Sequence, residues 1–228
     1  GPADLRGRRR PLGRRREDAR PAHPLHDEAG RLERSQGRGR GIPNIDSVKK
    51  TIATYYGDPG TGVASKTSSP YIKELKKLVK KQRKSLESRY RAAVRRGEKP
   101  ALVFDTDDTT LFTYDMEVKD MHFTFDPQLQ DEWVQDQRFP ATPAMAAYVK
   151  KAQKIGYTIV GLTGRSAGQE AATLKNLAKV GYGDAFTDAN FYTKWSGTKP
   201  SYITCKVATA CTTVEYKAGT RRYLERKR

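Results

Sequence analysis

The sequence predicts a mixed α/β fold in which a parallel central sheet is flanked by helices. Two apolar runs, residues 102–104 and 157–162, have the composition of buried strands, and each ends abruptly in polar side chains. Amphipathic helical patterns precede the first run and follow the second. Buried apolar strands of this kind are typical of parallel sheets, where the loops at the carboxyl ends of the strands form the ligand crevice.

The first 40 residues differ from the rest of the chain. They contain twelve Arg and no Lys, with few aliphatic residues and no apolar run long enough for a signal-peptide core or a membrane span. Such a composition cannot repay the entropy of folding, so we expect residues 1–40 to be disordered. Frequent Lys and Tyr begin after Arg40, which places a domain boundary there and assigns residues 41–228 to one domain.

The next expected element is a helix over residues 71–96. Apolar residues recur there at near-helical spacing, which indicates one buried face; they are Ile72, Leu75, Val79, Leu86, Tyr90 and Val94. The segment also carries eleven basic and two acidic residues, a large share of the net charge of +18. This basic face is either simply solvated or a surface that concentrates anionic substrates or binds nucleic acid. No zinc-ligand spacing or recognisable nucleic-acid-binding motif supports a nucleic-acid partner.

The first strand ends in the run from Asp105 to Thr110, which contains three carboxylates and three threonines. Asp105 and Asp107 stand two residues apart, so they would point to the same side if strand geometry persisted to the tip. Paired carboxylates suit nucleophilic attack by one and proton transfer by the other. The alternative is an Asp-rich turn in which Thr caps a helix.

The second strand ends at Thr163-Gly164-Arg165. A helical pattern follows directly and stops at Gly181, which would place Thr163 near a helix N-terminus, where backbone N–H groups attract phosphate. Thr163 would donate a hydrogen bond to the phosphate there, act as an N-cap, or do both. Arg165 would form paired hydrogen bonds to an anion or lie exposed on the surface.

Cys205 and Cys211 are the only cysteines and lie in a polar, Thr-rich stretch. Either they form a local disulfide that closes a hairpin-like loop, which suits an exported protein, or they are two free thiols. We expect the disulfide.

Three motifs in order give a family resemblance. The runs ending in Asp105-Thr106-Asp107 and in Thr163-Gly164, followed by Lys217, resemble the first three motifs of the haloacid dehalogenase-like phosphohydrolases. Further segments are similar to the secreted acid phosphatases of actinobacterial type, over about residues 41–222. These are Gly41-Ile42-Pro43-Asn44-Ile45-Asp46, Tyr55-Tyr56-Gly57-Asp58, Asp126-Pro127-Gln128, Gln137-Arg138-Phe139-Pro140-Ala141-Thr142-Pro143 and Glu215-Tyr216-Lys217-Ala218-Gly219-Thr220.

The resemblance implies a Rossmann-like core and an Mg-dependent phosphomonoesterase, secreted, that acts on a small phosphomonoester. Asp105 would be the nucleophile that forms an aspartyl-phosphate, and Asp107 the general acid and base. Thr163 and Lys217 would hold the phosphoryl oxygens. Mg would bind the Asp105 carboxylate and the Asp107 backbone carbonyl.

The resemblance also implies a small helical cap inserted at about residues 111–142, rich in aromatic residues and Met. His122 within this segment would take part in substrate recognition or proton transfer. Gly164, Arg165 and Lys217 would join Thr163 in binding the substrate, whereas most of the aromatic residues are expected to form core.

The family also has a fourth acidic motif, which we do not find after Lys217. We therefore expect a chain truncated before that motif, with the C-terminal part of the core missing. The abrupt change of sequence at both ends and the non-Met first residue indicate either a fragment or a misread coding frame. Three functions stay open: an acid phosphatase, an impaired relative that binds phosphate without turnover, and a basic nucleic-acid-binding protein.

Overall fold

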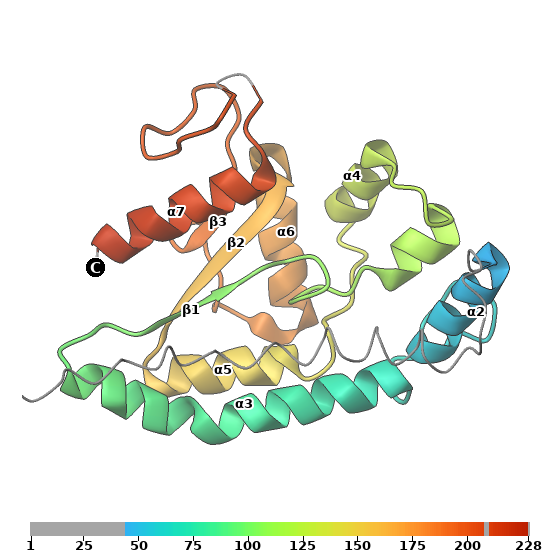
Figure 1. The fold of residues 1–228 in the computed structure, drawn as a ribbon, viewed down its shortest axis with the longest axis horizontal. Coiled ribbons are helices and arrows are strands. Elements are labelled where there is room, and N and C mark those ends of the chain that lie inside the picture. Colours follow the sequence, from blue (N-terminus) through green and yellow to red (C-terminus); the bar gives the residue numbers. More distant parts are fainter. Residues whose placement is uncertain (1–43, 208–209, 228) are drawn as a thin grey trace, which may run out of the picture. The chain divides into compact units, whose positions relative to one another are not determined.

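The computed structural model describes residues 44–207 and 210–227 (Figure 1). The segment expected to be disordered, residues 1–40, lies outside the described residues, as do residues 41–43 of the first family-like segment.

A three-stranded parallel sheet forms the centre of the domain, as the sequence predicted. Its strands are β1 (Ala101–Phe104), β2 (Thr158–Ser166) and β3 (Phe191–Lys194), in the order β1-β2-β3. Both predicted strands are present and adjacent, with Leu102 opposite Ile159. β1 forms one edge of the described sheet, because β3 pairs on the far side of β2.

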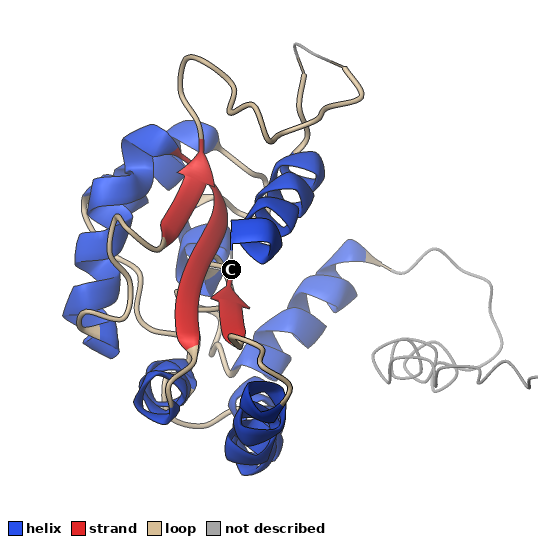
Figure 2. Ribbon diagram, turned by 90° about the vertical axis from the view of Figure 1, so that its left-hand side faces the viewer, coloured by secondary structure: helices blue, strands red, loops and turns tan. Residues whose placement is uncertain are grey.

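Helices cover both faces of the sheet (Figure 2). Side chains alternate along β2, so Ile159 packs into the main core with α5 (Met145–Ile155) and α6 (Glu170–Leu177). Leu162 instead packs with Ile203 and with Tyr216 of α7 (Thr213–Lys227) on the opposite face. The loops at the carboxyl ends of β1 and β2 therefore lie between two layers of helices.

The long predicted helix is α3 (Pro70–Arg95), which packs along α5 at the edge of the domain (Figure 1). Ser69 caps its first turn, and residues at intervals of seven are buried: Ile72, Val79, Leu86 and Ala93. Val94, expected on the apolar face, is 47% exposed, because Ala93 occupies the buried position beside it. The helix α2 (Ile45–Tyr56) packs against α3.

The segment at about residues 111–142 is helical, and contains the π-helical turn η1 (Met116–Asp120) and α4 (Pro127–Gln135). Asp126 caps α4, and Trp133 of α4 donates a hydrogen bond to Asp120 at 2.7 Å. Its aromatic residues are mainly core, as expected: Phe112, Tyr114, Trp133 and Phe139 are buried.

A helix follows the Thr163-Gly164-Arg165 run as predicted, but the strand before it does not end at Thr163. β2 continues to Ser166, which is opposite Lys194 of β3, and a single 3-10 turn, η2 (Ala167–Gln169), precedes α6. A capping box between Ser166 and Gln169 starts this turn. The stop signal was correct, because α6 runs into η3 (Ala178–Tyr182), where Gly181 leaves the helical conformation with φ +105°.

Candidate active site

The loop after β1 is a tight turn built on one carbonyl. The Thr106 carbonyl oxygen accepts the N–H groups of Thr110 at 2.9 Å and Leu111 at 2.8 Å. The Thr110 hydroxyl donates to the Asp105 carbonyl oxygen at 3.0 Å. Asp108 has φ +52°, a left-handed conformation that Asp tolerates, and its carboxylate accepts the Thr113 hydroxyl at 2.6 Å. The threonines of the motif therefore hold the backbone that carries Asp105 and Asp107.

Asp105 forms an ion pair with Lys217, 112 residues further along the chain, at 2.5 Å between Oδ2 and Nζ. Its other oxygen accepts the Thr106 N–H at 2.8 Å. The side chains of Asp105 and Lys217 are 39% and 27% exposed, so solvent and small ligands reach the pair. Two groups singled out from distant segments thus meet at the end of β1.

The place of Lys217 is set by the start of a helix. Lys217 lies in the second turn of α7, because the helix already begins at Thr213. Thr212 and Glu215 form a reciprocal capping box: the Glu215 N–H donates to the Thr212 hydroxyl at 3.2 Å, and the Thr212 N–H donates to Glu215 at 2.8 Å. The residue at which α7 begins therefore determines where Lys217 lies relative to the end of β1.

Two further features fix the start of α7. Cys205 and Cys211 form a disulfide, so Cys211 is tied down beside the Thr212 cap. Gly164 lies close to the first residue of the helix, since a Cβ at this position would approach Thr213 Cγ2 to 2.9 Å. Gly164 therefore supports the close packing of α7 on β2.

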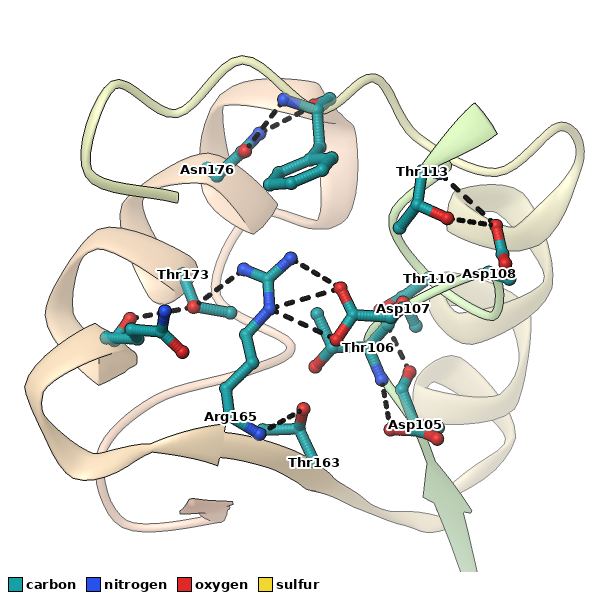
Figure 3. A network of polar contacts seen from close by, with 12 residues as sticks. Asp105, Thr106, Asp107, Asp108, Thr110, Thr113, Thr163, Arg165, Thr173 and Asn176 are labelled. Atoms are coloured by element: carbon teal, nitrogen blue, oxygen red, sulfur yellow. Dashed lines mark hydrogen bonds and ion pairs between the residues drawn. The ribbon is translucent and has the colours of Figure 1, made fainter. Parts of the chain in front are cut away.

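Asp107 is held by Arg165 (Figure 3). The guanidinium donates to Asp107 Oδ1 at 2.6 Å through one terminal nitrogen, and Nε lies 3.2 and 3.3 Å from the two carboxylate oxygens. The other terminal nitrogen donates to the Thr173 hydroxyl at 2.9 Å, and the group lies 4.8 Å from the Phe139 ring centroid. Because Arg165 is only 3% exposed, the alternative of an exposed surface arginine was wrong.

Thr163 lies within β2 and is fully buried, with the Arg165 N–H donating to its hydroxyl oxygen at 3.2 Å (Figure 3). It is separated from the first helix residue by the rest of the strand, so it is neither an N-cap nor a residue of a helix N-terminus. Because β2 runs parallel to β1, Thr163 nevertheless lies at the same end of the sheet as Asp105, beyond the carboxyl end of β1.

His122 is not brought together with the motif residues. It has φ +50° and lines a cavity of about 390 Å³ together with Lys119 and residues of α2 and the loop at 58–62. None of Asp105, Asp107, Thr163 and Lys217 lines this cavity.

Sequence reasoning missed a second carboxylate group beside the site. The Thr113 hydroxyl lies 2.6 Å from Asp108 and 3.0 Å from Glu117. Desolvation raises the pKa of the Glu117 carboxyl, and the nearby Asp108 raises it further. Desolvation, with these two acids, also raises the pKa of Tyr56 to about 12. The run of acids from Asp105 to Asp108 was the sequence signal for this group. Glu117 lies outside that run, one helical turn after Thr113, and belongs to no motif.

The site offers oxygen donors of the kind that a divalent cation takes. Magnesium takes oxygen ligands and is usually bound by one or two carboxylates together with water and substrate phosphate. The accessible Asp105 carboxylate and the carbonyl oxygens of the adjacent loop provide such donors. In the described residues, the single cluster of three metal-binding side chains elsewhere is Cys205, Cys211 and Glu215, and its sulfurs are joined in the disulfide.

Comparison with known proteins decides the family. The model of the HAD superfamily, subfamily IIIB (acid phosphatase), matches residues 60–228. The chain belongs to this family. The HAD acid phosphatase resemblance predicted from three motifs is therefore confirmed.

One solved structure resembles this HAD-family chain in fold, and two curated proteins resemble it in sequence. The crystal structure of a class C acid phosphatase from Bacillus anthracis with tungstate bound aligns with a TM-score of 0.51 and 22% identity, covering 78% of this chain and 64% of that one. The 28 kDa and 31 kDa stem glycoproteins of Glycine max are each 38% identical over 58 residues, which is 25% of this chain. The matched segment spans 23% and 20% of those two proteins.

Among the described residues, no helix combines the length and the apolar character that crossing a membrane requires.

Proposed function

We propose that this HAD-family protein hydrolyses small phosphomonoesters through an aspartyl-phosphate on Asp105. The ion pair between Asp105 and Lys217, at the carboxyl end of β1, carries the proposal. A nucleophilic carboxylate beside a lysine is suited to phosphoryl transfer, because the cation offsets the charge that builds up on the transferring group.

Each side chain has a distinct part in the two steps. An Asp105 oxygen attacks phosphorus, and the bond from phosphorus to the alcohol oxygen breaks. Asp107 protonates that oxygen as it leaves. Asp107 then takes a proton from water, which attacks phosphorus and releases inorganic phosphate and free Asp105. Lys217 and Thr163 hold the phosphoryl oxygens, while Arg165 keeps Asp107 in position.

The Asp105 carboxylate and the Asp107 carbonyl would hold a magnesium ion. When bound, the ion would offset the negative charges of the nucleophile and the phosphate. The stretch of β1 and its loop fits this donor set because Asp105 keeps acceptor capacity beyond its two hydrogen bonds.

The test is hydrolysis of a chromogenic phosphate monoester by the purified protein, beside Asp105→Asn. We expect turnover that a chelator removes and added magnesium restores, and no turnover in the variant. Asp131→Asn is the matched control, since Asp131 lies on α4 and, within the described residues, accepts side-chain hydrogen bonds from Gln135 and Gln169 alone. Turnover retained by Asp105→Asn would contradict the proposal.

We also propose that the protein works outside the cytoplasm. The disulfide between Cys205 and Cys211 supports this, because disulfides persist in oxidising compartments. Thiol labelling of protein isolated from its source is expected to find both cysteines blocked until a reductant is added. Free thiols in that protein would contradict the proposal.

A further inference from the structure

The helix α3 carries a row of cations on its solvent side, interrupted between Lys84 and Arg91, which the phosphatase chemistry does not use. We define this basic stripe as Lys73, Lys77, Lys80, Lys81, Lys84, Arg91 and Arg95, all of which are exposed. At 100° per residue these positions fall within an arc of about 100°. The buried residues of α3, such as Ile72 and Val79, lie on the opposite side of the helix.

The stripe is long and hardly neutralised. From Lys73 to Arg95 it runs about 33 Å along the helix axis. In the described part of the chain, Arg91 alone among the seven forms an ion pair, with Glu87. The other acid of the helix, Glu74, accepts the hydroxyl of Tyr55 at 2.6 Å.

This arrangement works against the stability of the helix. Like charges four residues apart are neighbours on a helix surface and destabilise the helix. The stripe contains four such pairs, which are Lys73 with Lys77, Lys77 with Lys81, Lys80 with Lys84, and Arg91 with Arg95. A row of opposite charge laid along the helix would remove this repulsion.

We propose that the basic stripe binds the phosphate backbone of double-stranded nucleic acid without reading its sequence. The stripe is about as long as one turn of the duplex, and a row of cations along one side of a helix suits phosphates that repeat along an axis. A membrane surface fits less well, because stable binding there combines attraction to anionic lipids with apolar groups that enter the bilayer. The exposed apolar residues of α3, Leu78 and Val94, point to other sides of the helix than the stripe.

The experiment measures binding of a fluorescent duplex of about 20 base pairs, of arbitrary sequence, over a series of salt concentrations. The stripe variant carries four changes: Lys73→Gln, Lys77→Gln, Lys81→Gln and Lys84→Gln. The control variant loses the same charge elsewhere, through Lys119→Gln, Lys175→Gln, Lys179→Gln and Lys206→Gln at exposed positions. We expect log Kd to rise with log salt in the unaltered protein, and that slope to be shallower by about 3–4 in the stripe variant but not in the control.

Three results would overturn the inference. These are no binding of the duplex at low salt, an equal loss of slope in both variants, and binding of anionic lipid vesicles in preference to the duplex. Circular dichroism checks that the stripe variant is folded, and its unfolding midpoint is expected to be no lower than that of the unaltered protein. Hydrolysis of a small phosphomonoester is expected to be the same in all three proteins, so this inference and the phosphatase proposal fail independently.

Discussion

At the scale of single residues, Arg165 is tied to the site by contacts that leave it little freedom to meet a substrate. Its guanidinium lies between Asp107, Thr173 and the ring of Phe139 and is almost fully buried. A fork of donors on a carboxylate fixes both the position and the rotation of that carboxylate. We therefore assign Arg165 the orientation of Asp107, in place of the phosphate contact expected from sequence.

Arg165→Met is expected to lower kcat by about 10–100-fold with little change in KM, because a misplaced proton donor slows the chemical step without weakening substrate binding. Arg165→Lys keeps the charge but loses the fork, so it is expected to restore only part of the rate. Steady-state kinetics with one chromogenic substrate measures both constants. A rise in KM at unchanged kcat would show instead that Arg165 contacts the phosphate.

The ionisation of Asp58 makes the stability of the folded state depend on pH. Its Oδ1 accepts the N–H groups of Gly60 and Thr61 at 2.8 Å each, and Oδ2 accepts the Tyr114 hydroxyl at 3.0 Å. Burial raises the pKa of the Asp58 carboxyl, but these hydrogen bonds outweigh burial and leave the pKa below its ordinary value of 3.8. The ionised form therefore stabilises the folded state above that value, and the contribution is lost as pH falls through the lower folded pKa.

Asp58→Asn keeps the shape of the side chain and removes its charge. We expect the variant to be less stable by about 1 kcal/mol at neutral pH, since hydrogen bonds to a charged acceptor exceed neutral ones by roughly that amount. The difference from the unaltered protein should close as the solution is acidified below pH about 4. Urea unfolding at several pH values measures it. An equal difference at every pH would mean that shape, and not charge, makes the contribution.

The motif residues could be identified from sequence because strand ends followed by acids or hydroxyls are local patterns. Asp105 was predicted in this way, whereas Lys217 was singled out only through the family resemblance, and the structure brings the two into contact. The partner of Asp107 could not be predicted, since Arg165 faces inward only because β2 continues past Thr163. Strand pairing beyond a motif depends on a neighbour, here β3, that has no pattern of its own.

At the scale of elements, the sheet depends on a close approach at its centre. Gly161 of β2 stands opposite Phe191 of β3, and a Cβ on Gly161 would lie 2.1 Å from Phe191 Cδ2. The ring occupies the space that any side chain at residue 161 would need. β2 and β3 can thus pair at this point because position 161 has no side chain.

Gly161→Ala is expected to destabilise the fold by about 1–3 kcal/mol, because the Phe191 ring must leave a packed position. Gly168→Ala is the matched control, as the nearest atom to its added Cβ is Ser166 Oγ at 3.9 Å. Urea unfolding compares the two variants with the unaltered protein. Equal stability of all three would contradict the tight packing of this strand pair.

The elements differ in how well the sequence predicts them. The strands β1 and β2 and the helix α3 were predicted because, in each segment, the spacing of the apolar residues and the length of the run fit one type of secondary structure. β3 has four residues, of which Phe191 alone is buried, so its pattern is too short to separate from a loop. Thr212 and Glu215 have the spacing of a capping box, which could have predicted the start of α7. The Thr-rich sequence around them made this pattern hard to recognise.

At the scale of the whole molecule, the site joins segments that only the assembled fold brings together. Asp105 and Lys217 meet because α7 covers the face of the sheet opposite α5, and Gly164 and the disulfide fix where α7 begins. Local sequence patterns carry no measure of such distances. The order of the motifs along the chain predicted the meeting only through the family resemblance.

Because the site exists only in the assembled fold, phosphate binding should stabilise the whole domain against unfolding. Thermal unfolding can therefore measure phosphate binding. A ligand that binds only the folded state adds about 2.7 kcal/mol at a concentration 100-fold above its Kd. For a domain of this size we expect inorganic phosphate at saturating concentration, with magnesium, to raise Tm by about 5–10 °C. Lys217→Gln removes a cation that would meet the phosphate, so its Tm should respond much less.

Asp107→Asn separates binding from turnover in the same measurement. Its Tm is expected to rise with phosphate as in the unaltered protein, while hydrolysis is lost, because Asp107 moves protons and does not hold the phosphoryl oxygens. The stripe variant of α3 serves as the control for general attraction of anions and should respond fully. If Lys217→Gln also responds fully, phosphate binds elsewhere on this basic molecule. The pair of Asp105 and Lys217 would then lose its role as the phosphoryl site.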